Sequence, residues 1–214
     1  MTATPPDTRL CREATELVRE ASPEYLFNHA LRSWHFAAAL AERQRVAHDA
    51  EVLYLGAIMH DIGLVRCLHD PIRFEVGGAN HARAELTQRG LDAARADVVW
   101  DVIALHTAVG IAEHKGPEVA LAHMGVSVDV TGRWMQDIPE RELATILELA
   151  PRAGFDEDFL ELIAEHIRAN PHVALFNFMD GVGRRRCQGY TAPEFEDVFA
   201  ANPLRALASR SSGR

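Results

Sequence analysis

Apolar residues recur at helical spacing through most of the 214-residue chain, and this pattern constrains the fold more than any other feature of the sequence. Alternating patterns typical of strands are scarce, and the main exception is Val126-Ser127-Val128-Asp129-Val130. Hydrophobic residues make up 48% of the chain and charged residues 25%, a composition that is ordinary for a globular protein and sufficient for a sizeable core. The sequence therefore predicts an all-α fold in one compact domain.

Start and stop signals divide the chain into several predicted helices. Ser22-Pro23-Glu24 indicates a helix start, because serine is able to cap and proline suits the first helical position. Asp70-Pro71 and Gly77-Gly78 indicate a loop over residues 68–78 that leads into the next helix. The predicted helical segments are residues 28–42, 49–60, 79–89, 97–107, 117–133, 139–149 and 156–170.

Charge and cysteine content narrow the class of protein. The formal net charge of -9 argues against a nucleic acid as partner, because phosphate binding requires a basic surface. The three cysteines form no CxxC pair and favour a reducing compartment. The N-terminus lacks the features of a signal peptide, and no apolar stretch reaches the roughly 18 residues of a membrane helix. We expect a cytoplasmic protein that acts on a small molecule and binds neither nucleic acid nor a membrane. A homo-oligomer is compatible with the sequence.

The dipeptide His60-Asp61 is the leading candidate for a metal site. It follows the apolar run of residues 54–59, and at a helix end two adjacent side chains can converge on one ion. Imidazole and carboxylate suit zinc, iron or manganese. An acid near a helix C-terminus also opposes the helix dipole unless a cation compensates it. The pair alone is weak evidence, because His48-Asp49 and His69-Asp70 repeat it, so the other motifs of the chain must support it.

The order His29, His60-Asp61, Asp129 resembles that of the HD superfamily of metal-dependent hydrolases, in which three helices bring these side chains to one ion. The resemblance covers roughly residues 21–132 and is closer still to the cyanamide hydratase-like branch. It implies a single HD-type helical domain with a mononuclear metal site, in which these four residues bind one divalent metal, zinc first and iron next. The segments that carry the closer resemblance are Asn28-His29-Ala30-Leu31-Arg32, Arg73-Phe74-Glu75-Val76-Gly77-Gly78-Ala79, Ile103-Ala104-Leu105-His106-Thr107 and Asp129-Val130-Thr131-Gly132.

The resemblance implies a hydratase or hydrolase that adds metal-activated water to a small polar molecule, for example to a nitrile-type carbon to give an amide or urea. A metal with an open coordination position lowers the pKa of bound water to about 7. Asp61, Glu75 and His106 are the candidate catalytic residues, because the leaving nitrogen or oxygen must be protonated. A loop salt bridge for Glu75 and a satisfied core histidine for His106 are the structural alternatives. The residues expected to contact the metal ligands and fix their orientation are Arg32, Asn28 and Thr107.

Three other functions stay open. An HD phosphohydrolase of nucleotides or phosphate esters is weakened by Leu64, which stands where many such enzymes carry lysine. A dinuclear iron oxygenase is the next alternative, because His81 and His106 lie between the His-Asp pair and Asp129 and could hold a second metal or contact substrate. A regulatory module without catalysis is disfavoured by the presence of all four expected ligands.

The remaining histidines and the domain boundaries complete the prediction. His35 points to a different helix face from His29, so the two cannot bind the same ion. Residues 1–20 are predicted as an N-terminal helical extension, 21–135 as the HD metal-binding core, 136–208 as C-terminal helices that pack on the same domain, and 209–214 as a mobile tail. The histidines predicted to be structural or exposed are His48, His69, His114, His123, His166 and His172.

Overall fold

The computed structural model describes residues 2–204, and every regular element in that range is helical, which confirms the all-α prediction. The predicted mobile tail lies outside the described residues. Within them, no helix is both long enough and apolar enough to cross a membrane. The α-helices are α1 (Arg9–Ala21), α2 (Glu24–Gln44), α3 (Ala50–Met59), α4 (Ile62–Arg66), α5 (Phe74–Gln88), α6 (Ala93–Leu105), α7 (Pro117–Thr131), α8 (Glu140–Leu149), α9 (Phe155–Ala169), α10 (Met179–Arg186) and α11 (Phe195–Ala200).

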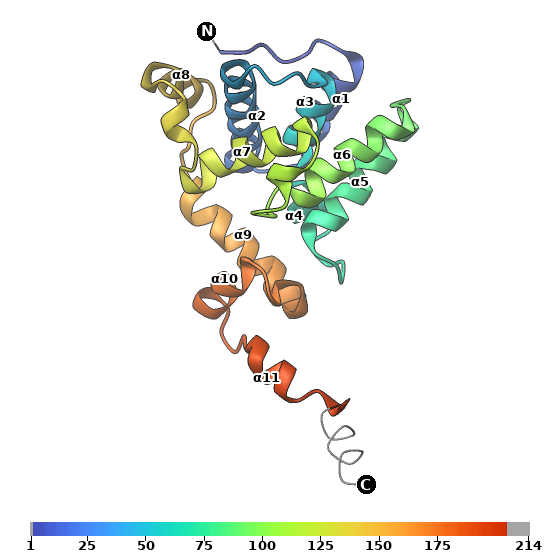
Figure 1. Cartoon of the computed structure of the whole chain (residues 1–214), viewed down its shortest axis with the longest axis vertical. Helices are drawn as coiled ribbons and strands as arrows, with labels where there is room; N and C mark the ends of the chain where they lie inside the picture. The colour runs from blue at the N-terminus through green and yellow to red at the C-terminus, as the bar shows by residue number, and fades with distance from the viewer. Residues whose placement is uncertain (1, 205–214) are drawn as a thin grey trace.

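The long helix α2 and helix α7 pack closely on each other in the body of helices at the N-terminal end of the long axis (Figure 1). Gly125 of α7 makes this approach possible. A Cβ atom at this position would lie 2.2 Å from the carbonyl oxygen of Ser33 and 2.8 Å from the amide nitrogen of Ala37, both in α2. The two backbones can therefore meet only where one helix has no side chain, and this contact brings the end of α7 beside the start of α2.

The break between α3 and α4 sets the position of His60 and Asp61. Asp49 caps the start of α3, because its carboxylate accepts hydrogen bonds from the amides of Glu51 and Val52. The helix ends at Met59, and His60 and Asp61 occupy the two positions before α4 begins at Ile62. The prediction that the pair lies at the C-terminal end of a helix is confirmed.

The boundaries of helix α5 differ from the prediction. The helix starts at Phe74 rather than at residue 79, so Gly77 and Gly78 lie inside it and not in a loop. A Cβ atom at Gly78 would lie 2.9 Å from the amide nitrogen of Gly63 in α4, and one at Gly63 would lie 2.0 Å from the carbonyl oxygen of Phe74. These glycines permit close packing of two helices, and reading Gly77-Gly78 as a turn was wrong.

Two other helix starts also differ from the prediction. Helix α6 begins at Ala93 rather than at residue 97, because the carboxylate of Asp92 accepts hydrogen bonds from two amides of the first turn. Helix α2 begins at Glu24 with Pro23 as its N-cap residue, and Ser22 instead terminates α1. The segment Val126–Val130, which has the composition of a strand, lies within α7.

The C-terminal helices extend from the central body towards one end of the long axis (Figure 1). Helix α9 contributes Phe155, Phe159 and Ile163 to a core that it shares with α4 and the start of α5. The rings of Phe155 and Phe159 lie 4.6 Å and 5.5 Å from the imidazole of His29. Helix α9 therefore covers the start of α2. Helix α11 contains no buried residue.

Candidate metal centre

Three predicted ligands meet between α2 and the α3–α4 break. The Nε2 atoms of His29 and His60 are 3.1 Å apart, and the Oδ2 atom of Asp61 lies 3.4 Å from the first and 3.2 Å from the second. One donor atom from each residue falls within 4.8 Å of the others, and all three side chains are buried. This group is compact enough to hold one metal ion.

Hydrogen bonds behind both imidazole rings direct Nε2 into the group. Nδ1 of His60 donates to the carbonyl oxygen of Ala57 at 2.8 Å. Nδ1 of His29 donates to the carboxylate of Asp129 at 2.6 Å. A ring that carries its proton on Nδ1 presents a lone pair at Nε2, which is the form that binds a metal.

Asp61 provides the strongest evidence that the group binds a cation. Its carboxylate is buried, and neither oxygen has a hydrogen-bond partner among the described residues. Burial works against the ionised carboxyl, but the imidazoles of His60 and His106 outweigh it and hold the pKa of Asp61 well below its usual range. A buried carboxylate that imidazole nitrogens approach at 3.2–3.5 Å without forming a hydrogen bond is costly unless a cation compensates it. The donor set, with two imidazoles and one carboxylate, therefore fits a divalent metal.

Asp129, predicted as the fourth ligand, lies beside this group and not within it. Besides Nδ1 of His29, its carboxylate accepts hydrogen bonds from Nε and Nη2 of Arg32, both at 2.8 Å, and from Nη1 of Arg152 at 2.9 Å. Burial opposes the charge of Asp129, yet His29 and Arg32 keep the pKa of this carboxyl well below its usual range. Both oxygens are engaged with these partners, and a ligand role for Asp129 stays a prediction.

A pocket of about 170 Å³ opens onto the three clustered residues. Its walls are mainly apolar and include Phe74, Val126 and Phe159. Among the described residues that line it, none is lysine or arginine. The pocket therefore presents a polar floor of imidazole and carboxylate groups beneath apolar walls.

His106, predicted as a catalytic residue, also lines this pocket. Its Nδ1 donates to the carbonyl oxygen of Ile103 at 2.6 Å, and its Nε2 lies 3.5 Å from Oδ1 of Asp61. Its ring packs edge-on against that of His60, with the ring centres 4.8 Å apart. His106 is therefore held beside the clustered residues with Nε2 directed towards Asp61.

Glu75 and Thr107 lie together next to His106. Thr107 lines the pocket, and its hydroxyl donates to the buried carboxylate of Glu75 at 2.9 Å. Arg73 also pairs with Glu75. The structure thus places Glu75 behind Thr107, where it orients the hydroxyl, and Glu75 itself is not among the residues that line the pocket.

Two predicted residues are not brought to the group. His81 is half-buried on α5, where Glu85 and Arg66 are its charged neighbours, and it does not line the pocket. Asn28 instead lines a separate surface hollow together with Leu31. Arg32, by contrast, is buried and reaches the group through Asp129, as expected of a supporting residue.

His123 was predicted to be structural or exposed, but the structure places it in the pocket wall. It is buried, and its Nδ1 donates to the carbonyl oxygen of His106 at 2.7 Å. The available signal was the helical spacing of His123, Ser127 and Val130, which puts all three on one face of α7. Because the segment is otherwise apolar, the sequence did not identify this face of α7 as part of a site.

Comparison with known proteins places this geometry in a family. The family model described as HD domain matches residues 26–143, which is more than half of the chain. The matched region contains all four residues that the sequence predicts as ligands. The search of curated proteins finds no match.

Proposed function

Since the chain belongs to the HD domain family, whose members are generally metal-dependent hydrolases, we propose that it is a metal-dependent hydratase that adds water to a nitrile-type carbon to give an amide or urea. The observation that carries this proposal is the absence of lysine and arginine among the described residues that line the pocket. A neutral nitrile needs no fixed cation for binding, whereas a phosphate ester carries negative charge that cationic side chains usually neutralise.

His29, His60 and Asp61 are the residues that would hold the metal. Three protein ligands with one open position are typical of catalytic zinc sites, which supports zinc first and iron next. When bound, such a cation supplies hydroxide at neutral pH by lowering the pKa of water to about 7. The hydrogen bonds of His29 to Asp129 and of His60 to Ala57 hold both rings in the required orientation.

His106 is the proposed proton-transfer residue. Addition of water to a nitrile leaves the nitrogen in need of a proton, and the residue that supplies it must face the reacting atoms. The hydrogen bond from Nδ1 to Ile103 leaves Nε2 to exchange protons, and this atom already lies 3.5 Å from Asp61. Phe74 and Phe159 contribute apolar wall to the pocket in which this step would take place.

The alternatives receive less support from the described residues. Leu64, which stands where many phosphohydrolases carry lysine, is buried in the core shared by α4 and α9 and adds no polar group to the pocket. A dinuclear site would require two further histidines beside Asp61. His106 approaches it, but His81 does not line the pocket, and Nε2 of His123, which does line it, lies 3.4 Å from Glu113.

The test is a substrate panel applied to the metal-loaded protein of 214 residues. We expect cyanamide or an organic nitrile to be converted to urea or an amide, and we expect p-nitrophenyl phosphate to be left intact. Asp61→Asn should abolish the conversion together with the retained metal. Release of phosphate without hydration of any nitrile would overturn the proposal in favour of a phosphohydrolase.

A further inference from the structure

Three exposed apolar side chains, Val109, Val130 and Phe178, line the pocket where it opens, next to the exposed Thr131, and we call these three the rim. Their exposed fractions are 64%, 43% and 45%. They come from the segment after α6, from the end of α7 and from the start of α10. Three apolar residues from separate parts of the chain that meet at one opening form a surface suited to contact with an apolar ligand.

Aromatic side chains connect the rim to the floor of the pocket. The ring of Phe178 packs against that of Phe74 with centres 6.4 Å apart, and Phe74 packs against His106 at 5.7 Å. On another side, Phe159 lies 5.5 Å from His29. A molecule that reaches Asp61 therefore passes aromatic side chains on two sides of the pocket.

Two of the hydroxyl groups that line the pocket have their protons engaged within the protein. The hydroxyl of Thr131 donates to the carbonyl oxygen of Ser127 at 2.8 Å, and that of Thr107 donates to Glu75. Both hydroxyl protons are thus already used within the protein. A cyanamide molecule would leave the rim and the upper walls without contact, because it has no apolar part.

We propose that the natural substrate carries an apolar group of about one aromatic ring, which lies against the rim and upper walls while the reacting carbon faces Asp61 and His106. This inference rests on the proposed function and specifies its substrate as an aryl or short branched alkyl nitrile. The size follows from the cavity of about 170 Å³, since an apolar cavity of about 150 Å³ in another protein accommodates benzene.

The first arm of the test compares benzonitrile with cyanamide as substrates of the metal-loaded protein, and the second measures binding of benzamide and urea by calorimetry. We expect a higher kcat/KM for benzonitrile and tighter binding of benzamide, with the negative heat-capacity change of apolar burial. Val109→Ser, Val130→Ser and Phe178→Ser should each lower the benzonitrile-to-cyanamide ratio, on the order of 10-fold for Phe178→Ser.

The matched control is Phe195→Ser. Phe195 is exposed on α11 and does not line the pocket, so its replacement should leave both substrates and both ligands unaffected. Faster hydration of cyanamide than of benzonitrile, with a ratio that the rim variants do not change, would overturn the inference and leave the proposed function standing. Rim-dependent binding of benzamide without hydration of any nitrile would support the apolar subsite and overturn the proposed function instead.

Discussion

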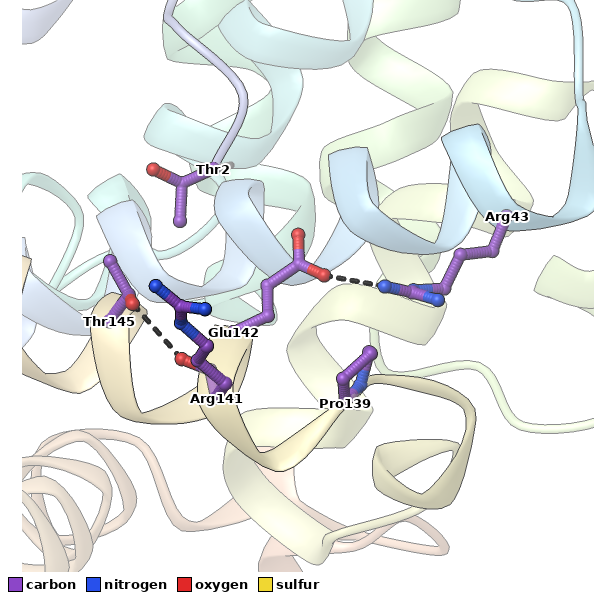
Figure 2. A pocket seen from close by; sticks show the side chains of 6 residues that line it. All are labelled: Thr2, Arg43, Pro139, Arg141, Glu142 and Thr145. Carbon is purple, nitrogen blue, oxygen red and sulfur yellow. Dashed lines mark hydrogen bonds and ion pairs between the residues drawn. The ribbon is translucent and has the colours of Figure 1, made fainter.

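Two hollows lie at opposite ends of helix α2 and differ in kind. The pocket near the start of α2 has a volume of about 170 Å³ and contains His29, His60 and Asp61 on its floor. The hollow near the end of α2 is larger, about 680 Å³, and includes Arg43 and Glu142 (Figure 2). Volume alone would favour the larger hollow as the functional site.

The hydrogen bonding of the polar groups instead favours the smaller pocket as the functional site. In the larger hollow Nη2 of Arg43 donates to Glu142 at 2.7 Å, and the hydroxyl of Thr145 donates to the carbonyl oxygen of Arg141 at 3.0 Å (Figure 2). These groups are paired with each other at the surface. In the smaller pocket the oxygens of Asp61 are buried and form no hydrogen bond with any residue that the structure describes. Buried polar atoms that lack a partner within the protein identify a binding site better than volume does.

Replacement of Asp61 is the most direct test of the difference between the two hollows. Asp61→Asn keeps the size of the side chain but removes its charge, so we expect retained metal to fall from roughly one ion per chain to a background level, with turnover lost in parallel. Elemental analysis of protein purified without added metal measures the first effect. Glu142→Gln is the matched control in the other hollow and should retain metal. Full metal content in Asp61→Asn would remove the basis for the site.

Asp129→Asn sharpens the description of the smaller pocket. If Asp129 acts by orienting His29, the variant should bind metal about 10- to 100-fold more weakly and recover full occupancy at higher metal concentration. Titration with zinc, followed by calorimetry, gives the affinity. A loss as complete as that of Asp61→Asn would instead establish Asp129 as a ligand, as the sequence predicts.

The close contact of α2 and α7 holds the smaller pocket together, and Gly125→Ala tests it. The added methyl group would lie 2.2 Å from the carbonyl oxygen of Ser33 in α2, so the helices must move apart, at a cost of about 1–3 kcal/mol in the free energy of unfolding. Urea denaturation measures this cost. Gly181→Ala is the control, because nothing lies within 4 Å of the added atom; it should stabilise the protein by about 0.5–1 kcal/mol. Equal stability of the two variants would contradict the close packing.

Sequence patterns predicted correctly a helix end that is set by residues close together in the chain. The helix predicted over residues 49–60 and the apolar run before His60 placed the His-Asp pair at a helix end, as the structure has it. Gly77-Gly78 misled the prediction because the sequence does not distinguish a glycine in a turn from one where two backbones meet. This second role depends on the partner helix, which only the folded structure reveals.

The candidate site shows the same limit. The resemblance to a known family named His29, His60 and Asp61, and the structure brings these three together. It did not reveal that Arg152 would join Arg32 at the carboxylate of Asp129, because Arg152 lies far along the chain, just before α9. Nor did it single out His123, whose place in the pocket follows from the rotation of α7 against α2.

The smallest expected effect belongs to the larger hollow and comes from Glu142→Gln. The side chain of Arg43 is 39% exposed, so water solvates its charge after the partner is neutralised, and the pair contributes only about 0.2–1 kcal/mol to the free energy of unfolding. Raising the salt concentration should shrink the difference from the wild-type protein, because ions screen a surface pair. Urea denaturation at low and high salt measures both quantities. A loss of stability above about 1 kcal/mol that salt does not reduce would mean that water does not solvate the charges of this hollow. The larger hollow would then not differ from the pocket around Asp61 in the way proposed.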